Sequence, residues 1–547
     1  MEKEFKLKDI SSLSLAPGMK REVEVEGLKD AKVLLLNAAG KIQAVGARCT
    51  HYGAPLAKGV LTSSGRLTCP WHGACFNASS GDIEDAPALD ALPVFAVSER
   101  DGAVFITGDE SAILSSRRNP ILGCSAATET KSDRVVVVGG GSGTMGLIQG
   151  LRERGYAGSV TVISRERYLP IDRPKLSKAL ITDPAKLALR DRSWFEMASI
   201  DWVEGEVVSV DLAARSVSTK DGSVFPFNKL VLAMGGAPRT LPLQGFSVLG
   251  NIFTLRTVPD AKAIVDAMGE KKGKKIVIIG SSFIGMEAAI ATCKDNSVTV
   301  VDMAKTPLER VLGEQVGEGI RKIAESKGVK FQLGASIDKA EPSTSDQSKV
   351  GAVCLKDGTR LEADLVILGV GVAPATEFLR DNSVLRLEQD GSIRTDNNFE
   401  VAGLKDIYAL GDIATHPYNG PGGEGKPVRI EHWNVAQNSG RTAAAHIAQR
   451  PDGHGHPSIP VFWSALGAQL RYCGHPANGW DELVLHGDVA EAKFVAYYAK
   501  GETVVAMASM GMDPAMAQSV ELMTLGKMPS KSQLKGGLDI MDVGVPE

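Results

Sequence analysis

The chain has 547 residues, of which 43% are hydrophobic and 23% are charged. This length exceeds what one hydrophobic core usually supports, so we expect roughly three or four domains. The formal net charge is −4 and no long Lys/Arg block occurs, which argues against a partner that is a nucleic acid. No apolar run reaches the about 18 residues of a membrane span.

The amino terminus and the cysteines bear on the compartment. The segment MEKEFKLKDI mixes acidic and basic residues and lacks the apolar stretch of a secretory signal. The seven cysteines are widely scattered, which is unlike a disulfide scaffold and favours a reducing compartment. We therefore expect a cytoplasmic protein without a membrane span.

The texture of the chain changes along its length. Residues 1–110 contain short β segments, such as Lys32–Leu36, Gln43–Val45 and Val104–Thr107, separated by turn pairs. Residues 111–132 show no periodicity and are rich in Ser, Ala and Thr, so they are predicted to be a linker. From Asp133 onward a strand, a Gly-rich turn, a helix and a second strand follow one another, and this unit occurs twice.

Two Cys/His segments in the first region suggest a metal centre. They are Cys49-Thr-His51 and Cys69-Pro-Trp-His72, and a hairpin between them can bring both together. Two thiolates and two imidazoles suit tetrahedral zinc or a [2Fe–2S] cluster. A zinc finger usually places both cysteines first, whereas each segment here supplies one Cys and one His. This order favours a cluster with both thiolates on one iron and both imidazoles on the other.

The motifs CTHYGAPL and CPWHGACF resemble those of the Rieske domain family. The resemblance implies a [2Fe–2S] cluster held by Cys49, His51, Cys69 and His72. Ala54 and Trp71 occupy positions where high-potential relatives form a disulfide, and Ala74 replaces their hydroxyl donor. Fewer donors to the cluster predict a low potential and a ferredoxin-like carrier. We expect its histidines to lie near solvent, where electrons leave.

The first Gly-rich unit begins with the strand Arg134–Val138 and continues into a helix and the strand Ser159–Ile163. Such a βαβ unit binds a dinucleotide pyrophosphate at its helix N-terminus. Two registers of the glycine pattern are possible, Gly139/Gly141/Thr144 and Gly141/Gly143/Gly146. The first is preferred because it begins at the strand end. Ser164 stands where an acidic residue is expected at the end of the second strand.

The second unit runs from Lys275–Ile279 through Gly280-Ser-Ser282-Phe-Ile-Gly285 to a strand that ends in Asp302. Asp302 lies 22 residues after Gly280, a distance that suits a carboxylate on the adenosine ribose. A carboxylate there repels a 2′-phosphate, so NADH is favoured over NADPH. Ser282 replaces the middle glycine of the pattern.

From Asp133 to about Tyr472 the chain resembles two-dinucleotide flavoprotein reductases of the ferredoxin-reductase and apoptosis-inducing-factor type. The resemblance rests on both Gly-rich units and on LPIDRPKLSK, LVLAMGGAPR, IYALGDIA and RIEHWNVAQ. With the Rieske segment, the whole chain resembles Rieske-fused, apoptosis-inducing-factor-like oxidoreductases. This implies FAD in the first unit, NAD(H) in the second and, by position, Lys178 and Glu287 beside the flavin where hydride arrives. The FAD residues implied are Gly139, Gly141, Ser142, Thr144, Arg173, Lys178, Ala233, Gly235, Arg239, Asp412, Trp433, Gln437 and Trp463. The NAD(H) residues implied are Gly280, Ser282, Gly285, Glu287 and Asp302.

The expected fold is multidomain, with an all-β Rieske domain followed by an α/β two-dinucleotide-binding flavoprotein and an α+β C-terminal domain. The expected boundaries are 1–110 (Rieske), 111–132 (linker), 133–259 and 383–452 (FAD), 260–382 (NAD) and 453–547 (C-terminal). The resemblance also allows a homodimer and a mitochondrial association.

The chain carries no closely spaced redox cysteine pair of the kind that reduces protein disulfides. The predicted activity is therefore NADH-dependent: hydride passes to FAD, and single electrons pass to the Rieske cluster and an unknown acceptor. Two alternatives stay open. One is a reductase of a small oxidant such as a quinone or oxygen. The other is a redox-sensing, apoptosis-inducing-factor-like interaction protein with slow NADH oxidase activity.

Overall fold

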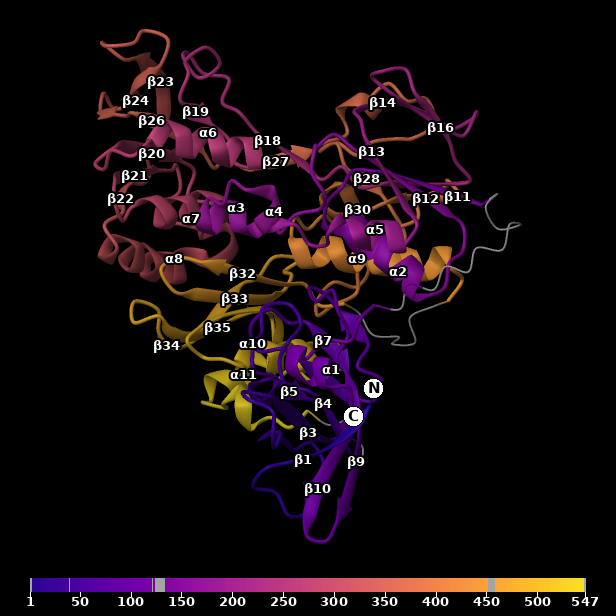
Figure 1. Cartoon of the computed structure of the whole chain (residues 1–547). Coiled ribbons are helices and arrows are strands. Elements are labelled where there is room, and N and C mark those ends of the chain that lie inside the picture. Colours follow the sequence, from indigo (N-terminus) through magenta and orange to yellow (C-terminus); the bar gives the residue numbers. More distant parts are fainter. Residues whose placement is uncertain (1, 39, 121, 123–132, 451–457, 546–547) are drawn as a thin grey trace.

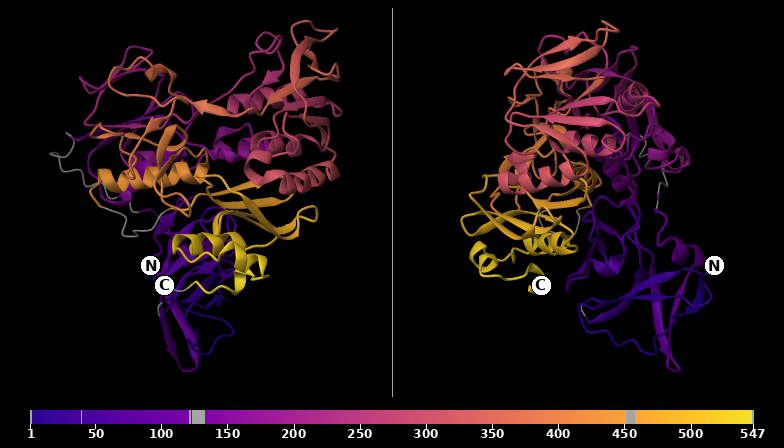
Figure 2. Two further views of the ribbon diagram at one scale, coloured as in Figure 1. Left: turned by 180° about the vertical axis from the view of Figure 1, so that it is seen from behind. Right: turned by 90° about the vertical axis from the view of Figure 1, so that its left-hand side faces the viewer.

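The computed structural model describes residues 2–38, 40–120, 122, 133–450 and 458–545. Two α/β units lie side by side at the top of the view in Figure 1, and the N-terminal and C-terminal domains lie below them. The turned views of Figure 2 show the same arrangement, with the indigo N-terminal domain beside the yellow C-terminal domain. Over these ranges, none of the helices combines the length and the apolar character that crossing a membrane requires.

The N-terminal domain is built from two antiparallel sheets, of six strands in the order β1-β10-β9-β4-β3-β2 and of four strands in the order β5-β6-β7-β8. Its strands are β1 (Lys3–Lys6), β2 (Lys20–Glu24), β3 (Lys32–Ala38), β4 (Lys41–Gly46), β5 (Val60–Leu61), β6 (Arg66–Thr68), β7 (Cys75–Asn77), β8 (Ile83–Asp85), β9 (Val94–Arg100) and β10 (Ala103–Gly108). The predicted strands fall in β3, β4 and β10. The short helix η1 (Leu56–Lys58) precedes β5.

The predicted linker begins with a helix rather than with irregular chain. Helix α1 (Glu110–Ser115) starts after Asp109, whose carboxylate accepts a hydrogen bond from the Ser111 amide. This N-cap overrides the polar composition of the segment. Residues 123–132 of the predicted linker lie outside the described residues.

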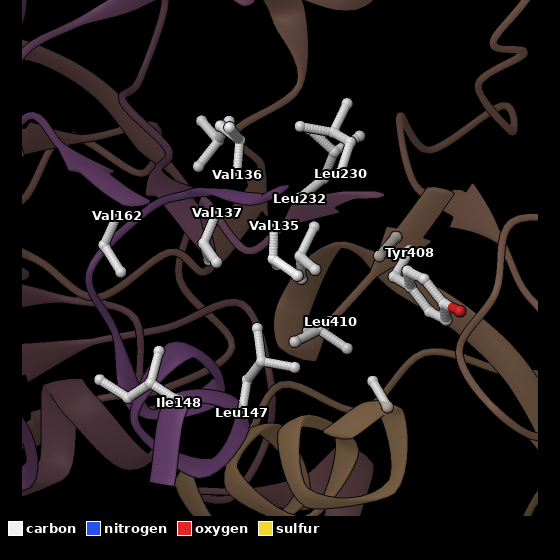
Figure 3. Packing of buried hydrophobic residues seen from close by; sticks show 14 of the residues in the cluster. Val135, Val136, Val137, Leu147, Ile148, Val162, Leu230, Leu232, Tyr408 and Leu410 are labelled. Carbon is white, nitrogen blue, oxygen red and sulfur yellow. The ribbon is translucent and has the colours of Figure 1, made fainter. Parts of the chain in front are cut away.

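The first α/β unit has a five-stranded parallel sheet in the order β13-β12-β11-β17-β29. Its elements are β11 (Arg134–Val138), α2 (Ser142–Glu153), β12 (Ser159–Ser164), α3 (Pro174–Ala179), α4 (Pro184–Leu187), α5 (Arg192–Met197), β13 (Ile200–Glu204), β17 (Lys229–Leu232), β29 (Ile407–Ala409), η4 (Gly411–Ile413) and α9 (Trp433–Ile447). In Figure 3, Leu147 and Ile148 of α2 lie below Val135 and Val137 of β11, and Val136 points to the opposite face. Side chains of β11 are therefore buried on both faces of the sheet, as is typical of parallel sheets that helices cover on both sides.

Smaller sheets extend this unit. They are formed by β14 (Val207–Asp211), β15 (Ser216–Thr219) and β16 (Val224–Pro226), and by β28 (Ile393–Arg394), β30 (Ala414–Tyr418) and β31 (Lys426–Val428). The two α/β units are connected by a two-stranded ribbon of β18 (Gly236–Pro238) and β27 (Val372–Pro374).

The second α/β unit repeats the pattern with a parallel sheet in the order β19-β26-β20-β21-β22. Its elements are β19 (Ile252–Phe253), α6 (Val258–Met268), β20 (Lys275–Ile279), α7 (Phe283–Thr292), β21 (Ser297–Val301), α8 (Glu309–Ser326), β22 (Lys330–Gln332) and β26 (Leu365–Leu368), with a separate antiparallel sheet of β23 (Ile337–Pro342), β24 (Val350–Leu355) and β25 (Arg360–Glu362). The short helix η3 (Glu377–Leu379) returns to the first unit, where Leu379 joins the core. The predicted strands of both units are confirmed.

The C-terminal domain contains a five-stranded antiparallel sheet in the order β32-β33-β36-β35-β34, covered by helices. Its elements are β32 (Val461–Ala465), β33 (Gln469–Gly474), β34 (Glu482–Asp488), β35 (Lys493–Lys500), β36 (Thr503–Met510), α10 (Ala515–Thr524), α11 (Lys531–Lys535) and η5 (Ile540–Asp542). This agrees with the predicted α+β domain.

A buried ionic cluster connects the N-terminal domain to the C-terminal domain. Arg66 of β6 donates to Glu521 of α10 at 3.0 Å, to Glu84 at 2.8 Å and to Asp85 at 2.9 Å. The Thr68 hydroxyl donates to the same Glu521 carboxylate at 2.6 Å. Because an unpaired buried charge is costly, this cluster selects one relative position of the two domains.

The N-terminal domain also contacts the first α/β unit through the segment 86–90. The amides of Asn434 and Gln437 on α9 donate to the carbonyl groups of Ala86 and Ala88, at 2.7 and 3.1 Å. Arg190 donates to the Asp90 carboxylate at 2.7 Å. The domain is thus held by polar contacts on two sides.

Candidate redox site

The two Cys/His segments form matching loops at adjacent tips of the N-terminal domain. The amide of Cys49 donates to the Ala54 carbonyl at 2.9 Å, and that of Cys69 donates to the Ala74 carbonyl at 2.8 Å. Each loop turns at a glycine in the left-handed region, Gly53 with φ 76° and Gly73 with φ 72°. A residue with a Cβ rarely adopts this conformation, which explains the glycine after each ligand segment.

The loops bring the four predicted ligands together as two pairs. The Nδ1 atoms of His51 and His72 lie 3.1 Å apart, and the buried thiols of Cys49 and Cys69 contact each other through a hydrogen bond. In the part of the chain that the structure describes, no group of three or more His, Cys, Asp or Glu gathers as it does around a single ion. A thiolate pair beside an imidazole pair is the donor set that fits the two irons of a Rieske cluster.

Desolvation keeps the two imidazoles in the form that binds metal. It lowers the pKa of His51 to about 4 and lowers the pKa of His72 further below its usual value. Neutral imidazole nitrogens are the state that a metal requires, so the site is prepared for metal at neutral pH.

Of the two imidazoles, that of His72 faces the interior of the protein, whereas His51 is half-buried. His72 is 6% exposed, and its ring centroid lies 4.3 Å from that of Trp463 on β32. Trp463 also contacts His51 at 5.6 Å and His432 at 5.3 Å between ring centroids. The expectation that both histidines lie near solvent is wrong for His72, because β32 of the C-terminal domain covers it. A Cβ at the adjacent Gly73 would lie 3.0 Å from the Val461 side chain.

Lys178 and Glu287 meet where three domains join. Lys178 of α3 pairs with Glu287 of α7 at 2.9 Å, and the Glu287 side chain is only 3% exposed. The hydroxyls of Ser177 and of Ser464 on β32 also donate to this carboxylate, at 2.5 and 2.6 Å. Sequence reasoning missed both serines, because their proximity depends on packing between domains. Because Ser464 follows Trp463 on β32, the ion pair lies next to the strand that carries Trp463.

His432 lies beside Trp463, close enough to Lys178 to feel its charge, and stays neutral. Its ring is 5.1 Å from that of Phe462, and it caps α9 by accepting from the Asn434 amide at 3.3 Å. Desolvation, together with the charge of Lys178, lowers the pKa of His432 to about 3. It therefore presents a neutral ring, rather than a charge, to Phe462 and Trp463.

The first Gly-rich loop turns directly at the end of its strand. Gly139 follows β11 with φ 108°, and the Thr144 hydroxyl donates to its carbonyl at 2.7 Å. A Cβ at Gly141 would meet nothing within 4 Å, which leaves open space in front of the N-terminus of α2, where Ser142 is the first residue. This open space and the free amides of the helix suit a dinucleotide pyrophosphate.

The other residues implied for FAD are distributed around this loop. Asp412 in η4 pairs with Arg256 at 2.9 Å, and a Cβ at Gly235 would approach both residues. Arg173 pairs with Glu166 at 2.6 Å and donates to the Arg256 carbonyl at 2.7 Å. Sequence reasoning did not identify Arg256, which links these groups.

Two of the implied FAD residues are engaged elsewhere in the structure. Arg239 is exposed and donates to the Val372 carbonyl on the ribbon between the units, at 3.0 Å. Gln437 donates to the N-terminal domain, as described above.

Ala233 follows β17 and lies against Gly139, since a Cβ at Gly139 would collide with the Ala233 carbonyl. Trp433 begins α9 and is half-buried.

The second Gly-rich loop is built in a similar way. Gly280 follows β20 with φ 98°, and Ser282 caps α7 and donates to the Gly369 carbonyl at 2.7 Å. A Cβ at Gly285 would collide with the Gly280 carbonyl. Asp302 after β21 accepts from the Ser281 amide at 2.5 Å and from its hydroxyl at 2.7 Å. The carboxylate is thus fixed beside the loop, where an adenosine ribose is expected.

Comparison with known proteins agrees with this architecture. Residues 133–440 match the family described as pyridine nucleotide-disulphide oxidoreductase. The chain belongs to this family. Residues 5–96 match the Rieske [2Fe–2S] domain, and residues 461–537 match the reductase C-terminal domain.

Individual relatives of this oxidoreductase combine the same domains or part of them. It is 38% identical to human apoptosis-inducing factor 3 over 95% of this chain and 84% of that protein. It is 32% identical to the ferredoxin–NAD(+) reductase component of the anthranilate 1,2-dioxygenase system of Burkholderia cepacia, over 74% of this chain and 97% of that protein. A chain in the crystal structure of the covalent putidaredoxin reductase–putidaredoxin complex superposes with a TM-score of 0.69 and 29% identity, over 75% and 97% of the two chains.

These matches establish an oxidoreductase that uses FAD, NAD(H) and a Rieske [2Fe–2S] cluster. The fold and the donor set described above fit these groups. The residue-by-residue contacts to FAD and NAD(H) stay predictions.

Proposed function

We propose that this oxidoreductase takes hydride from NADH onto FAD and passes single electrons to its own Rieske cluster, and from there to a separate acceptor. When bound, FAD supplies the change from hydride to single-electron chemistry, and the cluster supplies a one-electron centre. The observation that carries the proposal is the position of Trp463, which contacts both cluster histidines and also His432.

The side chains of the chain have distinct parts in this proposal. The Lys178–Glu287 pair places a fixed cation and a buried anion at the domain junction, where the nicotinamide is expected to approach. His432 stays neutral there, since its pKa is about 3, and adds an aromatic wall. Trp463, 5% exposed, excludes water between His432 and the imidazole pair. The ionic cluster of Arg66 and Glu521 holds the N-terminal domain in this position.

The test is an anaerobic titration of the holoenzyme with NADH, followed by visible absorbance and low-temperature EPR. Bleaching of the flavin with the appearance of a Rieske-type signal supports internal transfer. Trp463→Leu should slow the appearance of the signal, and Trp463→Phe should restore much of the rate. Trp480→Phe is the matched control, because Trp480 packs on Tyr498, outside the contacts of the histidines.

Two outcomes would contradict the proposal. A bleached flavin with a cluster that stays oxidised would leave the N-terminal domain without a part in NADH oxidation. Slow turnover with a long-lived reduced flavin and an NADH-dependent change in mass would favour a redox-sensing interaction protein. The name of the human relative makes that second outcome worth measuring.

A further inference from the structure

Tyr52 connects the cluster histidines to the protein surface. It follows the ligand His51 directly, and its ring stacks on the His51 imidazole with 3.8 Å between centroids and 14° between planes. Tyr52 is 37% exposed, whereas the other imidazole, that of His72, is 6% exposed and packs on Trp463. A conjugated ring in van der Waals contact with a ligand and open to solvent shortens the distance that an electron must cross to leave.

The first α/β unit fixes this ring in place. The Tyr52 hydroxyl donates to the carboxylate of Asp172, which also pairs with Lys175 at 2.9 Å. The Lys175 ammonium lies 5.0 Å from the centre of the Tyr52 ring. The orientation of Tyr52 therefore depends on the docked position of the N-terminal domain.

The surface around Tyr52 presents cations and hides their anionic partners. Lys175 is 37% exposed, whereas its partner Asp172 is 8% exposed. Arg117 is 47% exposed, whereas its partner Asp90 is 7% exposed. Arg117 belongs to the same surface, because it donates to the Asp90 carboxylate at 2.7 Å, and the hydroxyl of Thr50, next to His51, donates to the Asp90 carbonyl at 2.6 Å. An approaching molecule meets the cationic ends first.

We propose that Tyr52, with Lys175 and Arg117, forms the surface where an acidic one-electron carrier protein docks and receives the electron. This inference rests on the proposed function and names the class of its unknown acceptor. One electron leaves the reduced cluster and enters the carrier, and no bond or proton changes place. Charge complementarity selects an acidic partner. Because His72 is covered by Trp463, the electron leaves on the Tyr52 side of the imidazole pair.

The first experiment measures how fast the cluster is reoxidised. Holoenzyme is reduced with dithionite and mixed with ferricyanide, an anionic one-electron acceptor, and the decay of the Rieske EPR signal is followed by rapid freezing. Tyr52→Leu should slow the decay severalfold, and Tyr52→Phe, which keeps the stacked ring, should stay near the rate of the unsubstituted protein. Equal rates for all three proteins would overturn the exit through Tyr52.

A second experiment detects the charged surface without turnover. Dysprosium–EDTA, an anionic relaxation agent, should speed the spin relaxation of the dithionite-reduced cluster at low ionic strength. Lys175→Gln should weaken this effect about twofold to threefold, since attraction at an exposed site is screened by salt. The control Lys262→Gln also removes one lysine from an ion pair with an aspartate nearby in the chain, Asp266, and should leave the spin relaxation of the cluster unchanged.

Two outcomes of these measurements separate the inference from the proposed function. Equal relaxation in Lys175→Gln and in the unsubstituted protein would exclude the acidic docking surface. Lys175→Gln should slow reoxidation of the cluster by ferricyanide, but not by the cationic acceptor hexaammineruthenium(III). Equal slowing with the two acceptors would also exclude the acidic docking surface. Dithionite reduces the cluster without NADH, so a failure of NADH to reduce the cluster would contradict only the proposed function.

Discussion

The two Gly-rich units share one local design but differ in how they are enclosed. Helix α2 of the first unit is crossed closely by α9: a Cβ at Gly146 would collide with the Gln437 carbonyl, and one at Gly440 would collide with the Gly143 carbonyl. In the second unit Gly285 packs on its own loop, and Ile284 at the start of α7 is 40% exposed. The difference suits a cofactor that stays bound in the first unit and a coenzyme that exchanges in the second.

The largest effect is expected from Gly146→Ala, which removes the close crossing of α2 and α9. Backbone cannot yield as a flexible side chain does, so the cost should reach about 3 kcal/mol. The protein should lose FAD and unfold at a lower temperature, measured by visible absorbance per protein and by calorimetry. Gly536→Ala, where the new Cβ has a nearest contact of 3.3 Å, is the control. Full FAD content in Gly146→Ala would contradict the idea that the close crossing of α2 and α9 retains the cofactor in the first unit.

Glu287→Gln tests the junction between the two units. The variant keeps the volume of the side chain but leaves Lys178 without its charge partner. Because the Lys178 side chain is 21% exposed, we expect a loss of only about 1–2 kcal/mol in stability. Flavin reduction by NADH should slow by about tenfold, a change of about 1.4 kcal/mol in the barrier. Anaerobic stopped-flow absorbance measures the rate, and Glu325→Gln on α8, which pairs with Arg321, serves as an exposed control.

Asp302→Ala tests coenzyme choice in the second unit alone. The loss of a charged hydrogen-bond acceptor should lower kcat/KM for NADH by about tenfold, and activity with NADPH should fall less or rise. The FAD content should not change, because Asp302 belongs to the second α/β unit, whereas FAD is expected in the first. Steady-state assays with both coenzymes give the ratio. An unchanged ratio would place the adenosine ribose elsewhere, and Asp266→Asn is the surface control.

The smallest effect is expected from Ser282→Gly, which restores the middle glycine of the second loop. A helix cap loses only a few tenths of a kcal/mol when Ser becomes Gly, and the lost bond to the Gly369 carbonyl adds about 1 kcal/mol. NADH binding, measured by titration of the protein under anaerobic conditions, should stay within about twofold, a difference below 0.5 kcal/mol. A large loss of binding would show that the Ser282 hydroxyl contacts the coenzyme.

Local patterns in the sequence were sufficient for both Gly-rich units and for the cluster loops. A glycine at a strand end, such as Gly139 or Gly280, indicates a turn in the left-handed region, and this requirement can be read from the sequence around it. The spacing of Cys49, His51, Cys69 and His72 reports a donor set within one hairpin region. The short helix after Asp109 was missed because a single cap outweighed a composition typical of linkers.

The sequence by itself determined which groups the chain binds, because each binding loop is built from residues close together in the chain. Only the tertiary structure decided where those groups face. Trp463 covers His72, Ser464 reaches Glu287, and Glu521 pairs with Arg66 across a separation of 455 residues. Such contacts depend on how whole domains pack, and no local period or spacing encodes them. The same packing leaves Tyr52 at the surface beside Lys175.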